Sequence, residues 1–370
     1  MVKTSDVIVN QAVEKAMAGF LNEEGKTNIL VVGATGSGKS SLVNRVFQID
    51  FAKTGVGTPV TQATTKYEVD DFPITLFDTK GYEVATDEHK RFITEMESYM
   101  KDSKKKMDEQ IHMIWYCIAA SGHRVTETDL AMLKKFSDIN KPVCVVLTKS
   151  DITAVSDVNT LMQVLDEHGF DSFAVSSRAG IQLPKLMEWT YNHLDDAVKW
   201  AFLRAQQVNV ELKRTEINKA IRQHATMAFG VGFTPIPFAD GPILLANQGV
   251  MINRVLKGYG LDGLFGNFEN LIGTLGVGQI VSQLGRYLVA QILKFVPGVG
   301  TVAGGMINGS VATSITIALG LTVSEISYRV AIAKLQDENL DVESFMKSIP
   351  MDEIKGLFEQ FVKDELKRNK

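Results

Sequence analysis

One segment constrains the fold of this chain more than any other, the run Gly33-Ala-Thr-Gly-Ser-Gly38-Lys39-Ser40. It follows the apolar stretch NILVV at 28–32 and precedes a helical pattern that begins at Ser41. The run matches G-x-x-x-x-G-K-[ST], a pattern in which glycines let backbone N–H groups converge on phosphate oxygens at a helix N-terminus. It predicts a strand, a phosphate-binding loop and a helix. In such a loop Lys39 would reach the β- and γ-phosphates, and Ser40 would ligate Mg²⁺.

The rest of the first half alternates apolar runs with helical periods. The apolar runs occupy 28–33, 73–79, 112–119, 142–148 and 171–177, and the helical periods 129–136 and 159–168. Another helix is expected from Leu183 onward, continuing through a domain boundary near 204–211. Alternating elements of this kind predict an α/β fold with a doubly wound, mostly parallel sheet, which we assign to residues 28–205.

A second motif indicates which nucleotide is bound. Thr148-Lys149-Ser150-Asp151 follows the apolar run PVCVVL, at the strand end where ligands bind in open α/β sheets. A carboxylate at Asp151 can accept hydrogen bonds from guanine N1–H and N2–H₂, whereas adenine presents a lone pair at N1 and has no N2 amino group. The Lys149 stem can lie over the base. Taken alone, these four residues would also fit the end of a strand followed by a helix N-cap that binds no base.

Two weaker motifs stand in the same order along the chain. Asp78-Thr79-Lys80-Gly81 follows PITLF, and Ser176-Ser177-Arg178 follows DSFAV. They resemble the D-x-x-G and S-A-K motifs of GTPases, and this resemblance implies that Asp78 holds Mg²⁺ through water, that Gly81 N–H contacts the γ-phosphate and that Ser177 N–H meets guanine O6. The switch threonine is assigned to Thr61, with Thr58 and then Thr64 as alternatives.

Together these motifs predict one site for GTP or GDP with Mg²⁺. The nucleotide-binding residues are Gly33, Gly36, Ser37, Gly38, Lys39, Ser40, Ser41, Asp78, Thr148, Lys149, Asp151, Ser176 and Ser177. Lys39, Thr61 and Gly81 are the catalytic candidates, and Ser40, Thr61 and Asp78 the metal ligands.

On these motifs, residues 28–204 resemble the Era/septin-like, translation-factor class of P-loop GTPases, and GATGSGKSSLVN is also similar to immunity-related GTPases. The resemblance implies GTP hydrolysis. Tyr82 stands where related enzymes place a water-orienting Gln, and Gly36 where potassium-dependent ones carry Asn. Arg124 is an arginine-finger candidate, with a structural or subunit-interface role as the other interpretation. We therefore expect slow intrinsic turnover, stimulated by dimerisation or by a protein partner.

The second half of the chain has a different composition. Residues 225–324 hold only seven charged side chains but 18 of the chain's 30 glycines. Residues 206–370 therefore predict an all-α, glycine-rich domain, with an apolar helix at 243–255 and an amphipathic one at 352–370. The segments TPIPFAD, KGYG and VPGVGTVAGG resemble the helical domain of unknown function, family 697. A buried helical bundle, reversible membrane association and a membrane span all fit this composition.

The remaining expectations concern the N-terminus, the compartment and the partners. Residues 1–27 predict an amphipathic helix rather than a secretory signal, and only two cysteines among 370 residues fit a reducing compartment. The location is therefore expected to be cytoplasmic, with membrane association as the alternative. A formal net charge of −4 disfavours nucleic acid as a partner. A homodimer, an unidentified protein partner or a peripheral membrane contact stays open.

Overall fold

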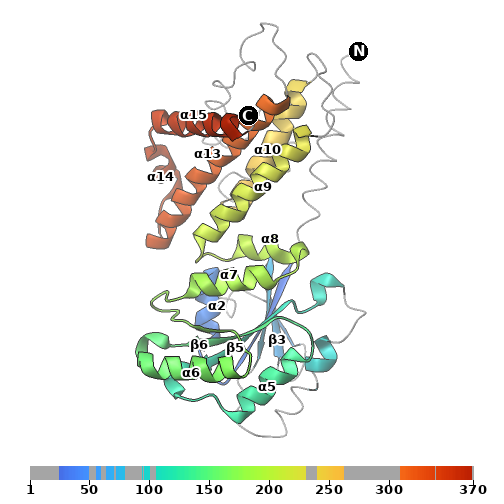
Figure 1. Cartoon of the computed structure of the whole chain (residues 1–370), viewed down its shortest axis with the longest axis vertical. Coiled ribbons are helices and arrows are strands. Elements are labelled where there is room, and N and C mark those ends of the chain that lie inside the picture. Colours follow the sequence, from blue (N-terminus) through green and yellow to red (C-terminus); the bar gives the residue numbers. More distant parts are fainter. Residues whose placement is uncertain are drawn as a thin grey trace. The chain divides into compact units, whose positions relative to one another are not determined.

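The computed structural model describes residues 25–49, 56–59, 64–70, 72–79, 94, 96–100, 106–230, 240–261, 309–337 and 339–368 (Figure 1). The described chain divides between Asn209 and Val210 into two compact units. The first is an α/β unit and the second is built of helices.

The α/β unit contains seven strands, β1 (Thr27–Gly33), β2 (Val56–Pro59), β3 (Thr64–Glu68), β4 (Ile74–Thr79), β5 (Met113–Ala119), β6 (Val143–Thr148) and β7 (Ser172–Ala174). Its helices are α2 (Lys39–Phe47), α5 (Glu127–Ser137), α6 (Val155–Glu167), α7 (Leu183–His193) and α8 (Asp196–Ala205), with short 3-10 turns η1 (Met107–Glu109), η2 (Ala120–Gly122) and η3 (Ser150–Ile152).

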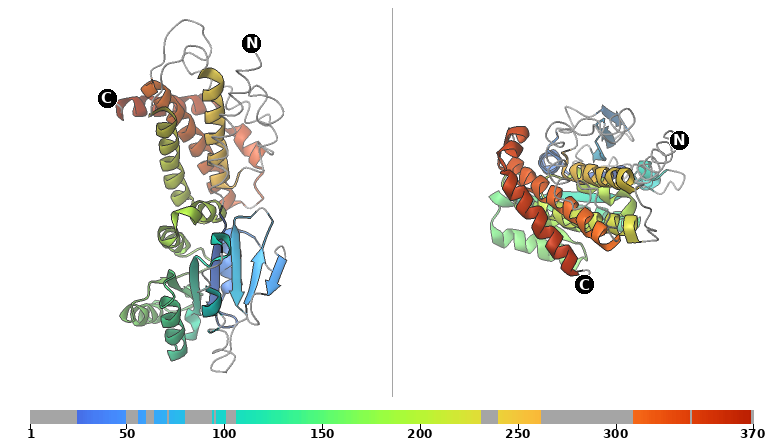
Figure 2. Two further views of the ribbon diagram at one scale, coloured as in Figure 1. Left: turned by 90° about the vertical axis from the view of Figure 1, so that its right-hand side faces the viewer. Right: turned by 90° about the horizontal axis from the view of Figure 1, so that it is seen from above.

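The strands form one sheet in the order β2-β3-β4-β1-β5-β6-β7. The neighbours from β4 to β7 pair in parallel, and of the seven described strands β3 alone runs against the others. Figure 2 shows β1 to β4 as the blue strands of this sheet. The predicted mostly parallel, doubly wound α/β fold is confirmed.

Side-chain alternation along the central strands builds a core on each face of the sheet. On β1, Ile29 and Val31 join the core under α2, α7 and α8, whereas Leu30 and Val32 join the core under α5 and α6. On β5, Trp115 belongs to the first core. Because β1 and β5 are buried on both faces, the carboxyl ends of the central strands are held on a rigid base.

The hairpin of β2 and β3 was absent from the sequence prediction. Val56–Pro59 contains a glycine and a proline, and Thr64–Glu68 has no long apolar run. Both features are poor strand signals. These strands form because β4 offers an edge, to which β3 pairs in antiparallel register from Thr64↔Thr79 to Glu68↔Thr75.

The helix predicted from Leu183 onward is wrong as one continuous element. It breaks at Leu194, whose backbone is extended (φ −80°, ψ 151°), before α8 begins. It breaks again at Gln206, where the side-chain Oε1 accepts from the backbone N of Val208 and Asn209 at 3.1 and 2.8 Å. Asn209 Nδ2 donates to Pro184 O at 2.8 Å, which holds this turn against α7. These side-chain bonds replace the helical ones, so the chain leaves α8 before the next helix starts.

The second unit consists of α9 (Val210–Gly230), α10 (Asp240–Tyr259), α13 (Gly309–Gln336), α14 (Val342–Ser348) and α15 (Met351–Arg368). Helix α13 is central and packs against α9, α10 and α15 (Figures 1 and 2). Gly320 permits this approach, because a Cβ there would lie 2.6 Å from Ile221 Cγ2. In the part of this unit that the structure describes, the predicted all-α character is confirmed.

Two of the predicted helices are present with different bounds. The helix expected at 243–255 lies within α10, which ends beside Gly260 (φ 72°). The amphipathic C-terminal helix is α15, with Ile354 and Phe358 buried. The predicted N-terminal helix and the glycine-rich segment before α13 fall outside the described residues.

One described helix is long and apolar enough to cross a membrane by length and composition. The candidate span is the part of α13 from Thr313 to Gln336. It has a mean hydropathy of 1.4, and 72% of its most apolar window is buried inside the protein.

Candidate functional site

The phosphate-binding loop lies between β1 and α2 and depends on glycine. Gly33, Gly36 and Gly38 have φ values of 150°, 74° and 88°. A Cβ at Gly33 would lie 2.2 Å from the backbone oxygen of Cys117, so no other residue fits there without moving β5. Gly38 is the N-cap of α2 and makes no side-chain cap. The first backbone amides of α2 therefore point toward a site that suits an anion.

Lys39 lies along this loop. Its Nζ donates to Gly33 O at 2.9 Å and to Ala34 O at 3.2 Å, and the residue is 8% exposed. Ser40 and Ser41, in the first turn of α2, are exposed. The ammonium group is thus held against the loop, while both hydroxyl groups face outward.

The end of β6 reaches the same loop from more than a hundred residues away. Thr148 Oγ1 donates to Ser37 O at 2.5 Å, and Lys149 Nζ donates to Gly36 O at 2.7 Å. Lys149 has a left-handed backbone (φ 58°), which directs its side chain back over the loop. A Cβ at Gly38 would lie 3.1 Å from Thr148 Oγ1, so that glycine makes room for the threonine.

The two predicted base-reading segments also meet. The backbone N of Ser150 donates to Val175 O at 3.2 Å, which joins the turn after β6 to the loop after β7. Asp151 lies in η3 and is exposed, so its carboxylate is accessible. In the loop after β7, the Oγ of buried Ser176 accepts a hydrogen bond from the backbone N of Ala179 at 3.0 Å, and Ser177 is half-buried.

Other predicted residues are placed only in part. Asp78 stands on β4 opposite Val31 of β1, two residues before the phosphate loop. Thr61 and Gly81 lie outside the described residues, as does Tyr82. The alternatives Thr58 and Thr64 lie on β2 and β3. The assignment of the switch threonine therefore stays a prediction.

One residue that fixes the site was missed by the sequence reasoning. Thr153 Oγ1 donates to Lys149 O at 3.0 Å and closes the turn that carries Asp151. A hydroxyl residue four positions after the lysine was the available signal, because threonine can bond to a carbonyl one turn back.

The residues present fit a nucleotide and its metal. The loop offers backbone amides, two accessible hydroxyl groups and a lysine, and the Oγ of Ser37 is buried without a hydrogen-bond partner among the described residues. No group of three or more His, Cys, Asp or Glu side chains that could hold a metal occurs in the described part of the chain. Mg²⁺ would be held by Ser40 and by oxygens of the nucleotide itself, with Thr61 and Asp78 as the other predicted ligands.

Known proteins match part of the chain. The family model described as 50S ribosome-binding GTPase matches residues 28–149. A probable GTP-binding protein EngB of Leuconostoc citreum is 30% identical over 181 residues, which cover 46% of this chain and 90% of that protein. Septin-8-B of Xenopus laevis is 28% identical over 153 residues, 36% of each chain.

Solved structures also align with part of the chain. A crystal structure of a probable GTP-binding protein EngB covers 45% of this chain and 97% of its own, with a TM-score of 0.33 and 15% identity. An Era protein of Aquifex aeolicus bound to GDP and AlF4⁻ covers 55% of this chain and 67% of its own, with a TM-score of 0.35 and 19% identity.

Proposed function

Because this chain belongs to the family of P-loop GTPases that includes the EngB proteins, we propose that it is a nucleotide-dependent switch with slow intrinsic turnover. It binds GTP and GDP with Mg²⁺ and hydrolyses GTP. In this proposal the helical unit is the effector or assembly module. Residues 225–327 resemble the helical family 697 in sequence, and the matching family model ends before them, at residue 149.

One observation carries the proposal, the joining of the base-reading turn to the phosphate loop. Lys149 and Thr148 bond to the carbonyls of Gly36 and Ser37, so the phosphate and base ends of a nucleotide are read by one connected structure. A nucleotide that satisfies both ends stabilises the pair of loops together. The switch residues, assigned to Thr61 and Gly81, would then order around the γ-phosphate and relax when it leaves.

The chain's own groups act on the nucleotide by position and charge. Bound Mg²⁺ neutralises charge on the phosphate oxygens. The first-turn amides of α2 and the Lys39 ammonium hold the phosphates where charge develops, and Asp151 orients the guanine. Tyr82 has no amide with which to orient water as a glutamine does, and this substitution supports a low intrinsic rate.

Guanine choice is tested with Asp151→Asn in the full chain. The carboxylate would accept two hydrogen bonds from the base, each worth about 1.5–3 kcal/mol for a charged acceptor, so we expect GTP affinity to fall at least about 100-fold. Xanthosine nucleotides should bind the variant better than the wild type. Asp166→Asn, an exposed substitution on α6, is the matched control. Unchanged GTP binding by Asp151→Asn would remove this residue from the site.

The low intrinsic rate is tested by measuring GTP hydrolysis over a range of protein concentrations. We expect the rate per molecule to rise with concentration or on addition of a protein partner. Arg124→Ala should lower the stimulated rate if this arginine acts on the nucleotide, and it should leave the rate unchanged if its role is structural. Fast turnover by dilute protein, with no dependence on concentration, contradicts the proposal.

A self-assembling or membrane-associated GTPase is the second candidate, for which the septin matches are the support. Under either candidate we propose a cytoplasmic location, with reversible membrane contact under the second. Flotation with liposomes in GTP and in GDP separates the two, since only the second predicts nucleotide-dependent binding.

A ribosomal or RNA role, suggested by the description of the family model, is disfavoured by the net charge of −4. Salt-sensitive RNA binding would support that role.

A further inference from the structure

The helical unit contains a cavity of about 370 Å³ between α9, α13 and α15. Both α9 and α15 pack against α13, and the cavity lies where these three helices meet. Its volume lies within the range of pockets that hold small molecules, about 300–1,000 Å³. Nothing in the nucleotide chemistry of the first unit uses it.

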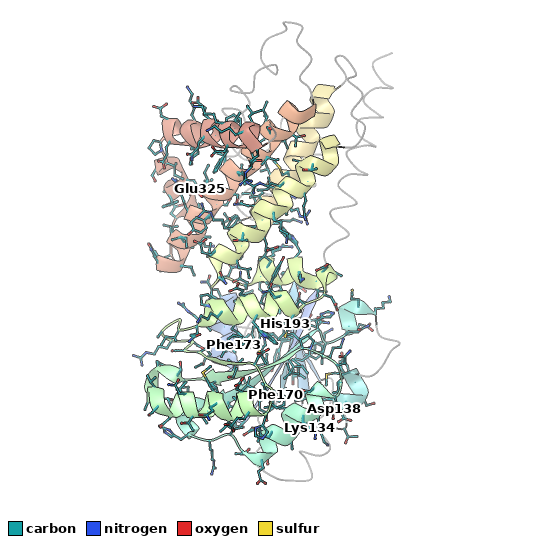
Figure 3. All side chains as sticks on the ribbon, viewed as in Figure 1. Lys134, Asp138, Phe170, Phe173, His193 and Glu325 are labelled. Atoms are coloured by element: carbon teal, nitrogen blue, oxygen red, sulfur yellow. The ribbon has the colours of Figure 1, made fainter. Side chains whose placement is uncertain are left out.

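The charged groups of the cavity are layered. The carboxylates of Glu325 (labelled in Figure 3) and Glu365 lie deep, with 14% and 6% of their side chains exposed. The guanidinium groups of Arg214, Arg222 and Arg368 lie over them, with 39%, 35% and 64% exposed. A molecule entering the cavity therefore meets arginines before it meets the buried carboxylates.

Two of these arginines converge on one oxygen. Arg222 Nη2 and Arg368 Nη1 lie 2.9 and 3.6 Å from Glu365 Oε1. At this oxygen one buried carboxylate faces two guanidinium groups, while over the whole lining three arginines meet three carboxylates, so the cavity carries no net charge. Each guanidinium has five N–H donors, and Arg222 Nε is buried without a hydrogen-bond partner among the described residues. Asp364 and Arg368 are both exposed parts of the lining, so solvent screens the two charges alike.

The remaining lining gives the cavity its length and an apolar wall. Arg214 precedes Arg222 by two helical turns of α9, about 12 Å at the usual rise per residue, and pairs with Glu325 at 2.7 Å. Leu321 and Phe361 contribute apolar surface. The cavity thus offers a pair of arginines at one end, with the unsatisfied Nε donor of Arg222, an apolar wall, and a third arginine farther along.

We propose that this cavity binds a small organic molecule that carries a phosphate group. The phosphate lies at Arg222 and Arg368, since guanidinium groups match phosphate oxygens in fork geometry. The organic body lies along Leu321 and Phe361 toward Arg214. This site is separate from the phosphate loop and does not depend on the proposed switch function.

The test uses the full chain saturated with GDP and Mg²⁺, so that the phosphate loop is occupied. Phenyl phosphate and inorganic phosphate are titrated by calorimetry. We expect saturable binding of phenyl phosphate, tighter than that of inorganic phosphate because of the apolar wall. Arg368→Gln should weaken it about tenfold or more, which corresponds to about 1.4 kcal/mol. Lys355→Gln, which removes a cation elsewhere on α15, should leave it unchanged.

Further variants keep the result interpretable. Arg368→Gln leaves Glu365 paired with Arg222, so the fold is retained. The double variant Arg222→Gln with Glu365→Gln removes this ion pair without leaving a buried charge. Lys39→Ala should retain phenyl phosphate binding. The proposal is overturned by the absence of saturable binding at about 1 mM probe, which corresponds to about 4 kcal/mol. It is also overturned by equal binding to wild type and Arg368→Gln, or by binding to phosphatidate vesicles but not to the free probe.

Discussion

The bond between Thr148 and Ser37 gives the sharpest test of how the two halves of the nucleotide site are joined. Thr148 is 2% exposed, and its Oγ1 donates to Ser37 O at 2.5 Å across 111 residues of sequence. Thr148→Val keeps the shape of the side chain but removes the donor. The buried carbonyl of Ser37 then loses its partner, at a cost of about 1–3 kcal/mol.

Two quantities should change in Thr148→Val. In a unit of this size a loss of 1 kcal/mol lowers Tm by about 2–4 °C, so the unfolding of the α/β unit should shift down by roughly 2–12 °C. The affinity for GDP should fall about tenfold if at least about 1.4 kcal/mol of the bond is lost from the bound state. Thermal unfolding measures the change in Tm, and competition with a fluorescent GDP analogue measures the change in GDP affinity.

Thr160→Val is the matched control for this experiment. Its Oγ1 also donates to a backbone carbonyl, that of Ser156 at 3.0 Å, but the residue is exposed and the bond is local to α6. Exposed substitutions of this kind change stability by no more than about 0.5 kcal/mol. If Thr148→Val melts within the control's range and binds GDP as tightly as the wild type, the loops are not coupled through this bond.

The remaining predictions concern backbone space and pH. Gly33→Ala places a Cβ 2.2 Å from Cys117 O, so we expect the free energy of unfolding in urea to fall by about 1–3 kcal/mol and GDP to bind much more weakly. The control is Gly122→Ala, which has open space around it and should change neither quantity. Burial, helped by the charge of Lys141, lowers the pKa of His112 in the folded chain. The unfolded chain therefore takes up the proton first, so stability should be complete above about pH 6.5 and fall as the pH drops below it. Urea unfolding between pH 7.5 and 5.5 measures this slope, and His112→Gln should reduce it; an equal slope in the variant contradicts the assignment.

The convergence of distant motifs was predictable because it follows from sheet geometry. The phosphate loop follows β1 and the Thr148–Asp151 turn follows β6, and both strands pair in parallel with β5. The carboxyl ends of parallel strands lie at one edge of the sheet, so segments that follow them meet there. Each motif is also short and local, so its residues identify it without knowledge of the fold.

The breaks after α7 and α8 could not be predicted in the same way. Leu194 continues the apolar spacing of a helix, yet it is buried at 4% exposure from an extended backbone, so its hydrophobicity fits both conformations. At Gln206 the deciding contacts are the bonds of its own side chain to the next turn and that of Asn209 to Pro184. Such contacts exist only once the helices are packed, and packing overrides helical spacing.

Helix α13 shows why hydropathy alone could not decide between a buried helical bundle and a membrane segment in the second half of the chain. An apolar helix suits a membrane and a protein interior equally, and what separates the two is where its polar side chains find partners. Ser324 Oγ donates to Asn218 Oδ1 at 2.7 Å and lies 3.1 Å from the hydroxyl of Tyr259. Glu325 pairs with Arg214 at 2.7 Å. These partners come from α9 and α10, so α13 cannot move into lipid without breaking bonds that a bilayer would not replace. Any membrane contact of this protein must therefore either leave the α9–α10–α13 packing intact or compensate each of those lost bonds.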